Sequence, residues 1–219
     1  MTDIYLDIET IPSQEDWVAE YITNSTKPPG NISKQESIDK WYAEKQDQAI
    51  EDNLRKCSFD GAMNHIVCIA VAIDDYEPVA FSATTATEER NVLETFYYYI
   101  ENNTDTFGNR YIGHNITGFD LRVMLQRSIV LGVQPCGGVP FHAKPWDMNP
   151  FDTMTKWDPR NSIKLNVIAK ALGLEGKKSV DGSMVYDMWK GGQDKDIAEY
   201  AKDDVRLVRE IHKRMKGFF

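Results

Sequence analysis

Two acidic residues stand two positions apart near the start of the chain, in Asp7-Ile8-Glu9. Residues 3 to 9 alternate between apolar and polar side chains, which predicts a β-strand. On a strand both carboxylates leave the same face, about 6 to 7 Å apart along the chain. Mg²⁺ and Mn²⁺ prefer such oxygen ligands, and the chain lacks the His and Cys clusters of a zinc site. Because Asp-x-Glu is also common on half-exposed strands, the pair alone leaves a structural role open.

A second acidic candidate lies in Gly113-His114-Asn115-Ile116-Thr117-Gly118-Phe119-Asp120, where a short predicted strand meets a predicted helix. Junctions of this kind commonly hold functional sites. Asp120 is equally suited to a structural role, as a helix N-cap that accepts backbone N–H groups. His114 is more typical of a structural histidine than of a ligand.

The third candidate is Tyr200-Ala201-Lys202-Asp203-Asp204, near the end of the chain. Residues four positions apart share one face of an α-helix, so the Tyr200 phenol and the Asp204 carboxylate would point the same way. Taken alone, this pattern favours a solvated acidic helix face. The order and spacing of the three motifs carry more information than any one of them.

Together the three motifs resemble the DEDD superfamily of 3'-5' exonucleases, in its tyrosine branch. The stretches Asp7-Ile8-Glu9-Thr10-Ile11-Pro12, Leu172-Gly173-Leu174-Glu175-Gly176-Lys177 and 197 to 205 are similar to stand-alone exonucleases related to the proofreading domain of family B DNA polymerases. The resemblance spans residues 3 to 12 and 62 to 215. It implies an α/β, ribonuclease H-like fold, with a central mixed five-stranded sheet flanked by helices.

The resemblance also implies catalytic roles for Asp7, Glu9, Asp120, Tyr200 and Asp204. Four carboxylates would hold two divalent metal ions, Mg²⁺ or Mn²⁺, and Asp7 would bridge them. Glu9 and Asp204 would bind the ion on the nucleophile side, and Asp120 would serve the second ion. Two ions about 3.5 to 4 Å apart stabilise both the attacking and the leaving oxygen of a phosphoryl displacement. Tyr200 would orient the attacking water, because a phenol with an ordinary pKa near 10 is a poor general base.

Further residues are candidates for substrate binding. By resemblance, the terminal nucleotide would contact the backbone at Thr10 and Ile11 and the side chains of Asn115 and Phe119. A local excess of lysine before the last predicted helix is suited to phosphates, although a solvated surface explains it as well. These lysines are Lys164, Lys170, Lys177 and Lys178. Asp152, at the end of a predicted strand, is expected at most to support the site.

The hydrophobic pattern predicts the elements that must position these residues. Strands are expected at 3–9, 65–73, 78–82, 110–113 and 150–154. One helix is expected to begin at Thr87 and to continue through Ile100, and others are expected at 119–131, 162–172 and 194–215. Antiparallel strands first and helix-separated strands later predict a mixed sheet with helices on both faces.

A polar segment separates the first motif from the next strand. It runs from residue 13 to about 60 and contains the break Lys27-Pro28-Pro29-Gly30 between two stretches compatible with helices. We expect a single exonuclease domain over residues 1–219, with a helical insertion at 13–60 within it. The composition of the insertion permits a strand guide, a partner-binding arm or a solvated appendage.

Composition limits the class of protein. The formal net charge of -9 argues against binding nucleic acid by bulk electrostatics, yet divalent metals and local basic residues permit a nuclease. The three cysteines have no Cys-x-x-Cys spacing, so we expect reduced, partly buried thiols. The sequence shows no secretory signal and no stretch long enough to cross a bilayer, so a cytoplasmic protein without a membrane partner is expected.

These observations favour a metal-dependent 3'-5' exonuclease that acts on single-stranded or frayed DNA ends. Two alternatives stay open. One is an exoribonuclease, because two-metal chemistry does not itself use the 2'-hydroxyl. The other is a catalytically weak module that binds nucleic acid or a replication protein. Replication or recombination proteins are possible partners in trans, and the sequence specifies neither a pathway nor an oligomeric state.

Overall fold

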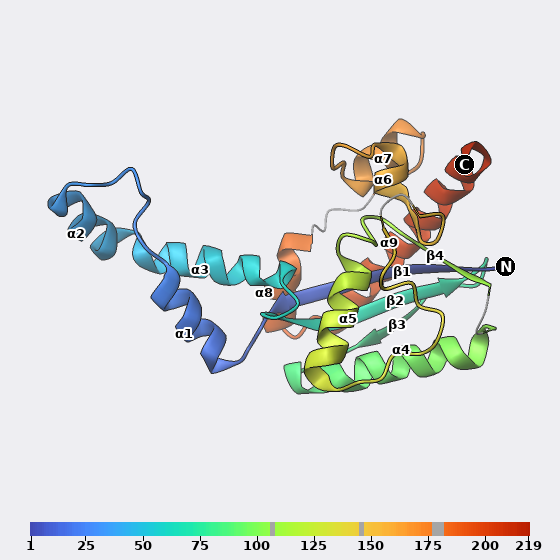
Figure 1. Cartoon of the computed structure of the whole chain (residues 1–219), viewed down its shortest axis with the longest axis horizontal. Helices are drawn as coiled ribbons and strands as arrows, with labels where there is room; N and C mark the ends of the chain where they lie inside the picture. Colours follow the sequence, from blue (N-terminus) through green and yellow to red (C-terminus); the bar gives the residue numbers. More distant parts are fainter. Residues whose placement is uncertain (106–107, 145–146, 177–181) are drawn as a thin grey trace.

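A five-stranded mixed sheet lies at the centre of the protein (Figure 1). The computed structural model describes residues 1–105, 108–144, 147–176 and 182–219. The strand order is β3-β2-β1-β4-β5. The strands are β1 (Thr2–Pro12), β2 (Asn64–Ile73), β3 (Val79–Ser82), β4 (Asn109–Gly113) and β5 (Phe151–Asp152). Neighbours in β1 to β3 run antiparallel, whereas β4 and β5 extend the sheet in parallel from β1.

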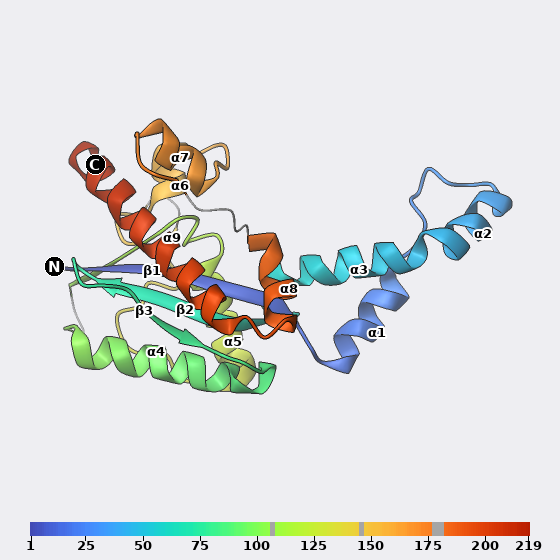
Figure 2. The ribbon, with the colours of Figure 1, turned by 180° about the vertical axis from the view of Figure 1, so that it is seen from behind.

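Helices cover both faces of the sheet, as predicted. One face packs against α4 (Glu89–Asn103) and α5 (Asp120–Leu131), through a buried cluster that includes Ile4, Leu6 and Ile8 of β1. The other face packs against α7 (Leu165–Ala171), α8 (Val185–Lys190) and the long α9 (Asp194–Met215). Figure 2 shows α9 running across this second face. The expected α/β fold with a mixed five-stranded sheet is therefore confirmed.

The central strand β1 decides which side chains meet. Because strand side chains alternate between faces, Tyr5 belongs to the cluster under α9, while Ile4 and Leu6 belong to the opposite cluster. Asp7 and Glu9 follow Tyr5 at the same period, so both project toward α9. The pairing of β1 with β2 shifts between Glu9 and Thr10, and this irregularity lies directly after the acidic pair.

The segment after β1 forms an arm that projects from the sheet (Figure 1). It consists of α1 (Asp16–Ser25), α2 (Gln35–Glu44), α3 (Gln46–Lys56) and a short 3-10 turn, η1 (Cys57–Phe59). The Pro-Pro-Gly break lies between α1 and α2. A small apolar cluster of Val18, Ile22 and Cys57 joins the arm internally. The insertion is thus helical, as expected.

Several elements differ from the sequence-based prediction, among them β1, which extends to Pro12 rather than ending at Glu9. The strand expected at 150–154 ends at Asp152, because the Asp152 carboxylate accepts backbone N–H groups of Met154 and Thr155 and caps α6 (Thr153–Trp157). The helix expected at 162–172 begins only at Leu165, and Gly173 follows it with a left-handed φ of 70°. Helix α8 was not predicted.

Further 3-10 turns lie at η2 (Ala86–Glu88), η3 (Gly182–Met184) and η4 (Lys216–Phe218). The three cysteines are free and buried, in agreement with the expected reduced thiols. Within the described residues, no helix combines the length and the apolar character needed to cross a bilayer.

Candidate active site

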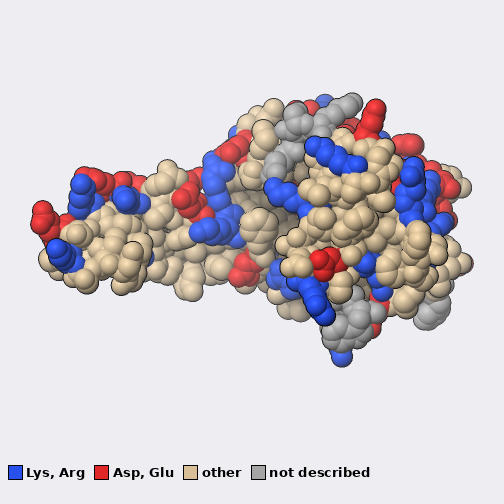
Figure 3. All heavy atoms as spheres, turned by 90° about the horizontal axis from the view of Figure 1, so that it is seen from above, with Lys and Arg blue, Asp and Glu red and all other residues tan. Residues whose placement is uncertain are grey.

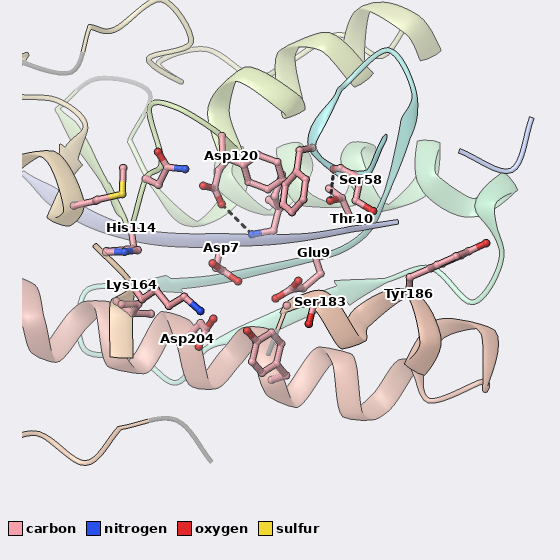
Figure 4. Close-up of a pocket in the computed structure, with 18 of the residues that line it drawn as sticks. Asp7, Glu9, Thr10, Ser58, His114, Asp120, Lys164, Ser183, Tyr186 and Asp204 are labelled. Atoms are coloured by element: carbon pink, nitrogen blue, oxygen red, sulfur yellow. Dashed lines mark hydrogen bonds between the residues drawn. The ribbon is translucent and has the colours of Figure 1, made fainter. Parts of the chain in front are cut away.

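Three carboxylates converge between β1 and α9. Asp7, Glu9 and Asp204 each place one oxygen within 4.8 Å of the other two. Asp7 is half-buried, and Glu9 and Asp204 are buried. Figure 4 shows the three side chains pointing toward one another. The acidic pair of the first motif and the aspartate of the third therefore meet, although almost the whole chain separates them.

Helix α9 brings two candidate residues to this place. Tyr200 and Asp204 are four positions apart and lie on the buried face of the helix, with exposed fractions of 9% and 5%. The solvated acidic face that the Tyr-x-x-x-Asp pattern also permitted is contradicted at these two positions. Asp203, their neighbour, is exposed and pairs with Arg206 instead.

Asp120 lines the same pocket but is not part of the three-carboxylate cluster. It is the first residue of α5 and the N-cap is Phe119, so the N-cap alternative is wrong. One Asp120 oxygen accepts the backbone N–H of Ile8 in β1 at 3.1 Å (Figure 4). Burial raises the pKa of Asp120 to about 7, helped by the charges of Asp152 and Asp204 and opposed by the N–H donors of Asp120 and Ile8.

Asp152 holds the turn that carries the second motif. Its buried carboxylate accepts the N–H groups of Asn115 at 2.9 Å and Thr117 at 3.2 Å, and the Thr117 hydroxyl at 2.9 Å. Asn115 has a left-handed φ of 62°, a conformation that asparagine tolerates better than most residues. Asp152 therefore fixes the backbone before Phe119 and Asp120, which is the supporting role expected for it.

His114 behaves as a structural histidine. Its Nδ1 lies 3.0 Å from the Thr153 hydroxyl and its Nε2 lies 2.8 Å from the Ile163 carbonyl oxygen. Both ring nitrogens are thus engaged by neighbouring segments. The imidazole borders the pocket and connects the end of β4 to the segment before α7.

The acidic cluster lies in a pocket of about 740 Å³. Nine of the candidate residues line it: Asp7, Glu9, Thr10, Asn115, Phe119, Asp120, Lys164, Tyr200 and Asp204. In Figure 4 the Lys164 side chain extends from the start of α7 toward the carboxylates. All five expected catalytic residues are therefore collected at one place.

Other candidates are not brought to the pocket. Ile11 is fully buried in the core under α9 and does not line the pocket. Lys170 is exposed and also absent from the lining. Lys177 and Lys178 lie outside the described residues.

The insertion contributes pocket residues that sequence reasoning missed. Arg55, Lys56, Ser58 and Phe59 line the pocket from the end of α3 and from η1, opposite Tyr186 of α8. These residues lie outside the three motifs. The sequence feature that could have indicated a role in the pocket is the basic pair Arg55-Lys56. Arg55 binds Asp187 in a bidentate pair at 2.8 and 3.0 Å, which ties the arm to α8. The arm therefore forms part of the pocket wall.

The chemistry of the cluster fits a hard divalent cation. Three carboxylates whose oxygens lie this close repel one another when ionised, and a cation among them removes that cost. The donors are carboxylate oxygens alone, which suits Mg²⁺ or Mn²⁺ better than a metal that prefers sulfur or nitrogen. Asp7, Glu9 and Asp204 are thus able to share one ion.

Comparison with known proteins agrees with the resemblance seen in the motifs. Residues 140–209 match a family described as predicted 3'-5' exonuclease related to the exonuclease domain of PolB. The matched region contains Tyr200 and Asp204 but neither Asp7, Glu9 nor Asp120. Among curated proteins, none matches the sequence.

A solved structure with a similar fold is the family B DNA polymerase from the hyperthermophilic archaeon Pyrobaculum calidifontis. The similarity covers 100% of this chain and 25% of that one, with a TM-score of 0.62 and 19% sequence identity. The chain thus spans about a quarter of the length of the polymerase. At this identity the likeness concerns the fold, and it supports the α/β architecture with a mixed sheet.

Proposed function

We propose that the protein is a metal-dependent 3'-5' exonuclease that removes nucleotides from single-stranded or frayed DNA ends. The observation that carries the proposal is the convergence of Asp7, Glu9 and Asp204, with Tyr200 beside them, inside one pocket. The family match over residues 140–209 supports the same activity.

Two divalent ions would be held by the four carboxylates of the pocket. Asp7, Glu9 and Asp204 would hold the first, and Asp7 together with Asp120 would hold the second. When bound, the ions supply charge stabilisation for the phosphoryl oxygens and make a water molecule more acidic. One Asp120 oxygen accepts an N–H from β1, so its other oxygen would serve the second ion, directly or through a water.

The side chains around the cluster would orient the reactants. Tyr200 would hold the attacking water through its hydroxyl, and Asn115 and Phe119 would position the terminal nucleotide. The water oxygen forms a bond to phosphorus and the bond from phosphorus to the 3' oxygen of the preceding nucleotide breaks. The leaving oxygen takes up a proton, so the products are a nucleoside 5'-monophosphate and a shortened strand with a 3'-hydroxyl.

Local positive charge would offset the acidic character of the whole chain. Arg55, Lys56 and Lys164 border the pocket, and Figure 3 shows Lys and Arg side chains gathered where the arm joins the body. Phosphate contacts of this kind fix the position of a strand without reading its sequence. We therefore expect cleavage that depends little on base identity.

The test is a time course on a 5'-labelled single-stranded DNA and on the matched RNA, with Mg²⁺, with Mn²⁺ and with EDTA. We expect a ladder that shortens from the 3' end of the DNA only when a metal is present. Preferential degradation of the RNA would move the substrate to the ribonucleotide alternative. A folded protein that cleaves neither strand with either metal would contradict the proposed activity and favour a binding module.

A further inference from the structure

The turn at the end of the helical insertion, η1 (Cys57–Phe59), reaches back to the pocket and is fixed there by its backbone. The Ser58 carbonyl oxygen accepts the Thr10 hydroxyl at 2.7 Å and the Asn64 amide at 2.9 Å. The Phe59 carbonyl oxygen accepts Arg122 of α5 at 3.2 Å. Contacts from β1, β2 and α5 thus hold this turn in one place, beside the acidic pair.

The Phe59 side chain, in contrast, is 65% exposed. It lines the pocket together with Phe119, and the two ring centroids are 6.1 Å apart with planes at 61°. Two rings in this arrangement form a corner, so a flat group that stacks on one ring meets the edge of the other. An exposed aromatic ring on a fixed backbone loses little conformational freedom when it binds a ligand.

The surroundings of this corner suit a nucleic-acid strand. Figure 4 shows Thr10 and Ser58 at the same stretch of β1 as Glu9 but on the other side of the strand. Phe59 and Phe119 line the same pocket as Asp7, Glu9 and Asp204. Arg55 and Lys56, at the last turn of α3, border the same pocket. Lys56 offers positive charge for a phosphate backbone, whereas Arg55 is paired with Asp187 and Glu51. Aromatic rings beside a positively charged path are the combination that binds single strands without sequence preference.

We infer that Phe59 binds a base near the 3' end of the substrate strand, in the corner that it forms with Phe119. The helical insertion is then a wall of the substrate site rather than a solvated appendage. The inference rests on the proposed function, since it names a substrate contact of that same site. It assigns the contact to a residue of the insertion, outside the three acidic motifs.

The test measures binding instead of cleavage, by fluorescence anisotropy with Ca²⁺ in place of Mg²⁺. The probes are a 5'-fluorescein oligothymidylate and the same strand with abasic residues at its last two positions. For the wild-type protein, removal of the bases should weaken binding about tenfold, as expected for stacking on an aromatic ring. Phe59→Ala should weaken binding of the normal strand by a similar factor and leave the abasic strand unaffected.

Phe218→Ala is the matched control, because Phe218 is 86% exposed and lies at the C-terminal end of the chain. It should bind both strands like the wild type. If Phe59→Ala bound each strand as tightly as the wild type does, the role of Phe59 would be overturned. The same conclusion would follow if Phe59→Ala weakened binding of the normal and the abasic strand by the same factor. A wild-type protein that binds neither strand would instead contradict the proposed function itself.

Discussion

The buried acidic residues around the pocket differ in what their carboxylate oxygens contact. Oxygens of Asp7, Glu9 and Asp204 lie close to one another, whereas those of Asp152, also buried, accept hydrogen bonds from backbone N–H groups. The first arrangement is costly without a cation, and the second satisfies the carboxylate within the protein. The three close carboxylates are therefore the candidates for metal ligands, and Asp152 is a support.

Asp204→Asn should abolish cleavage, because it removes charge from the cluster with little change of shape. We expect a loss of at least about a thousandfold, on the order of 4 kcal/mol in transition-state stabilisation. Mg²⁺ should raise the melting temperature of the wild-type protein and leave that of the variant nearly unchanged, since only a bound ion stabilises the fold. A variant that still binds Mg²⁺ and cleaves would remove Asp204 from the site.

Tyr200→Phe should be milder than Asp204→Asn. The phenyl ring keeps the packing of Tyr200 in the buried cluster between α9 and the sheet, and only the hydroxyl that would orient the water is lost. We expect kcat to fall by about 10- to 100-fold, the effect of one oriented hydrogen bond, with KM nearly unchanged. If the variant were as inactive as Asp204→Asn, the tyrosine would have to do more than position water.

At the scale of the elements, the sequence was most informative where the apolar period was long and unbroken. The last helix was predicted as 194–215, and α9 spans Asp194–Met215, because its apolar face repeats through the whole length. The strand predicted at 150–154 was wrong in its bounds. A two-residue strand is too short to show an alternating pattern, and it ends where the Asp152 side chain caps α6. Sequence also missed that the arm returns to the pocket, because contacts between Phe59 and Phe119 have no pattern along the chain.

The arm divides into a part that borders the site and a part that does not. Helix α2 lies at its far end in Figure 1, and the apolar cluster of Val18, Ile22 and Cys57 contains no α2 residue. Replacing residues 28–44 with a short Gly/Ser linker should therefore leave the fold and the cleavage of short single strands within about twofold, a change under 0.5 kcal/mol. Circular dichroism and initial rates test this. A tenfold loss of rate in a folded variant would place α2 in the substrate path.

At the scale of the whole molecule, a buried polar pair outside the pocket lining also joins α9 to the sheet. His212 of α9 is fully buried beside Tyr5 of β1, with its Nδ1 3.0 Å from the phenol oxygen, and it stacks edge-on with Phe151 of β5. Burial lowers the pKa of His212 to about 4, and the charges of Arg110 and Lys216 act in the same direction against Asp3. The folded protein thus favours the neutral form of the His212 ring.

This pKa predicts a loss of stability in acid. Between about pH 6.5 and pH 4 the unfolded chain binds a proton at His212 that the folded protein does not, so the free energy of unfolding falls as the pH drops. The full effect, reached below pH 4, is about 3 kcal/mol. The free energy of unfolding is measured by urea denaturation at several pH values between 7 and 4.5. His212→Gln should lose less stability toward acid than the wild type, whereas His142→Gln, at an exposed position, should follow the wild type. Parallel profiles for the wild type and His212→Gln over this range would contradict the assignment.

The most direct test joins metal occupancy to cleavage in the same samples. Mn²⁺ binding is followed by electron paramagnetic resonance while a 5'-labelled single strand is digested, for the wild type and for Asp7→Ala. We predict that cleavage by the wild type rises with bound Mn²⁺ and that the variant, still folded, loses both tight Mn²⁺ binding and the ladder of 3'-shortened products. Undiminished cleavage by Asp7→Ala would show that the cluster of Asp7, Glu9 and Asp204 is not the catalytic centre.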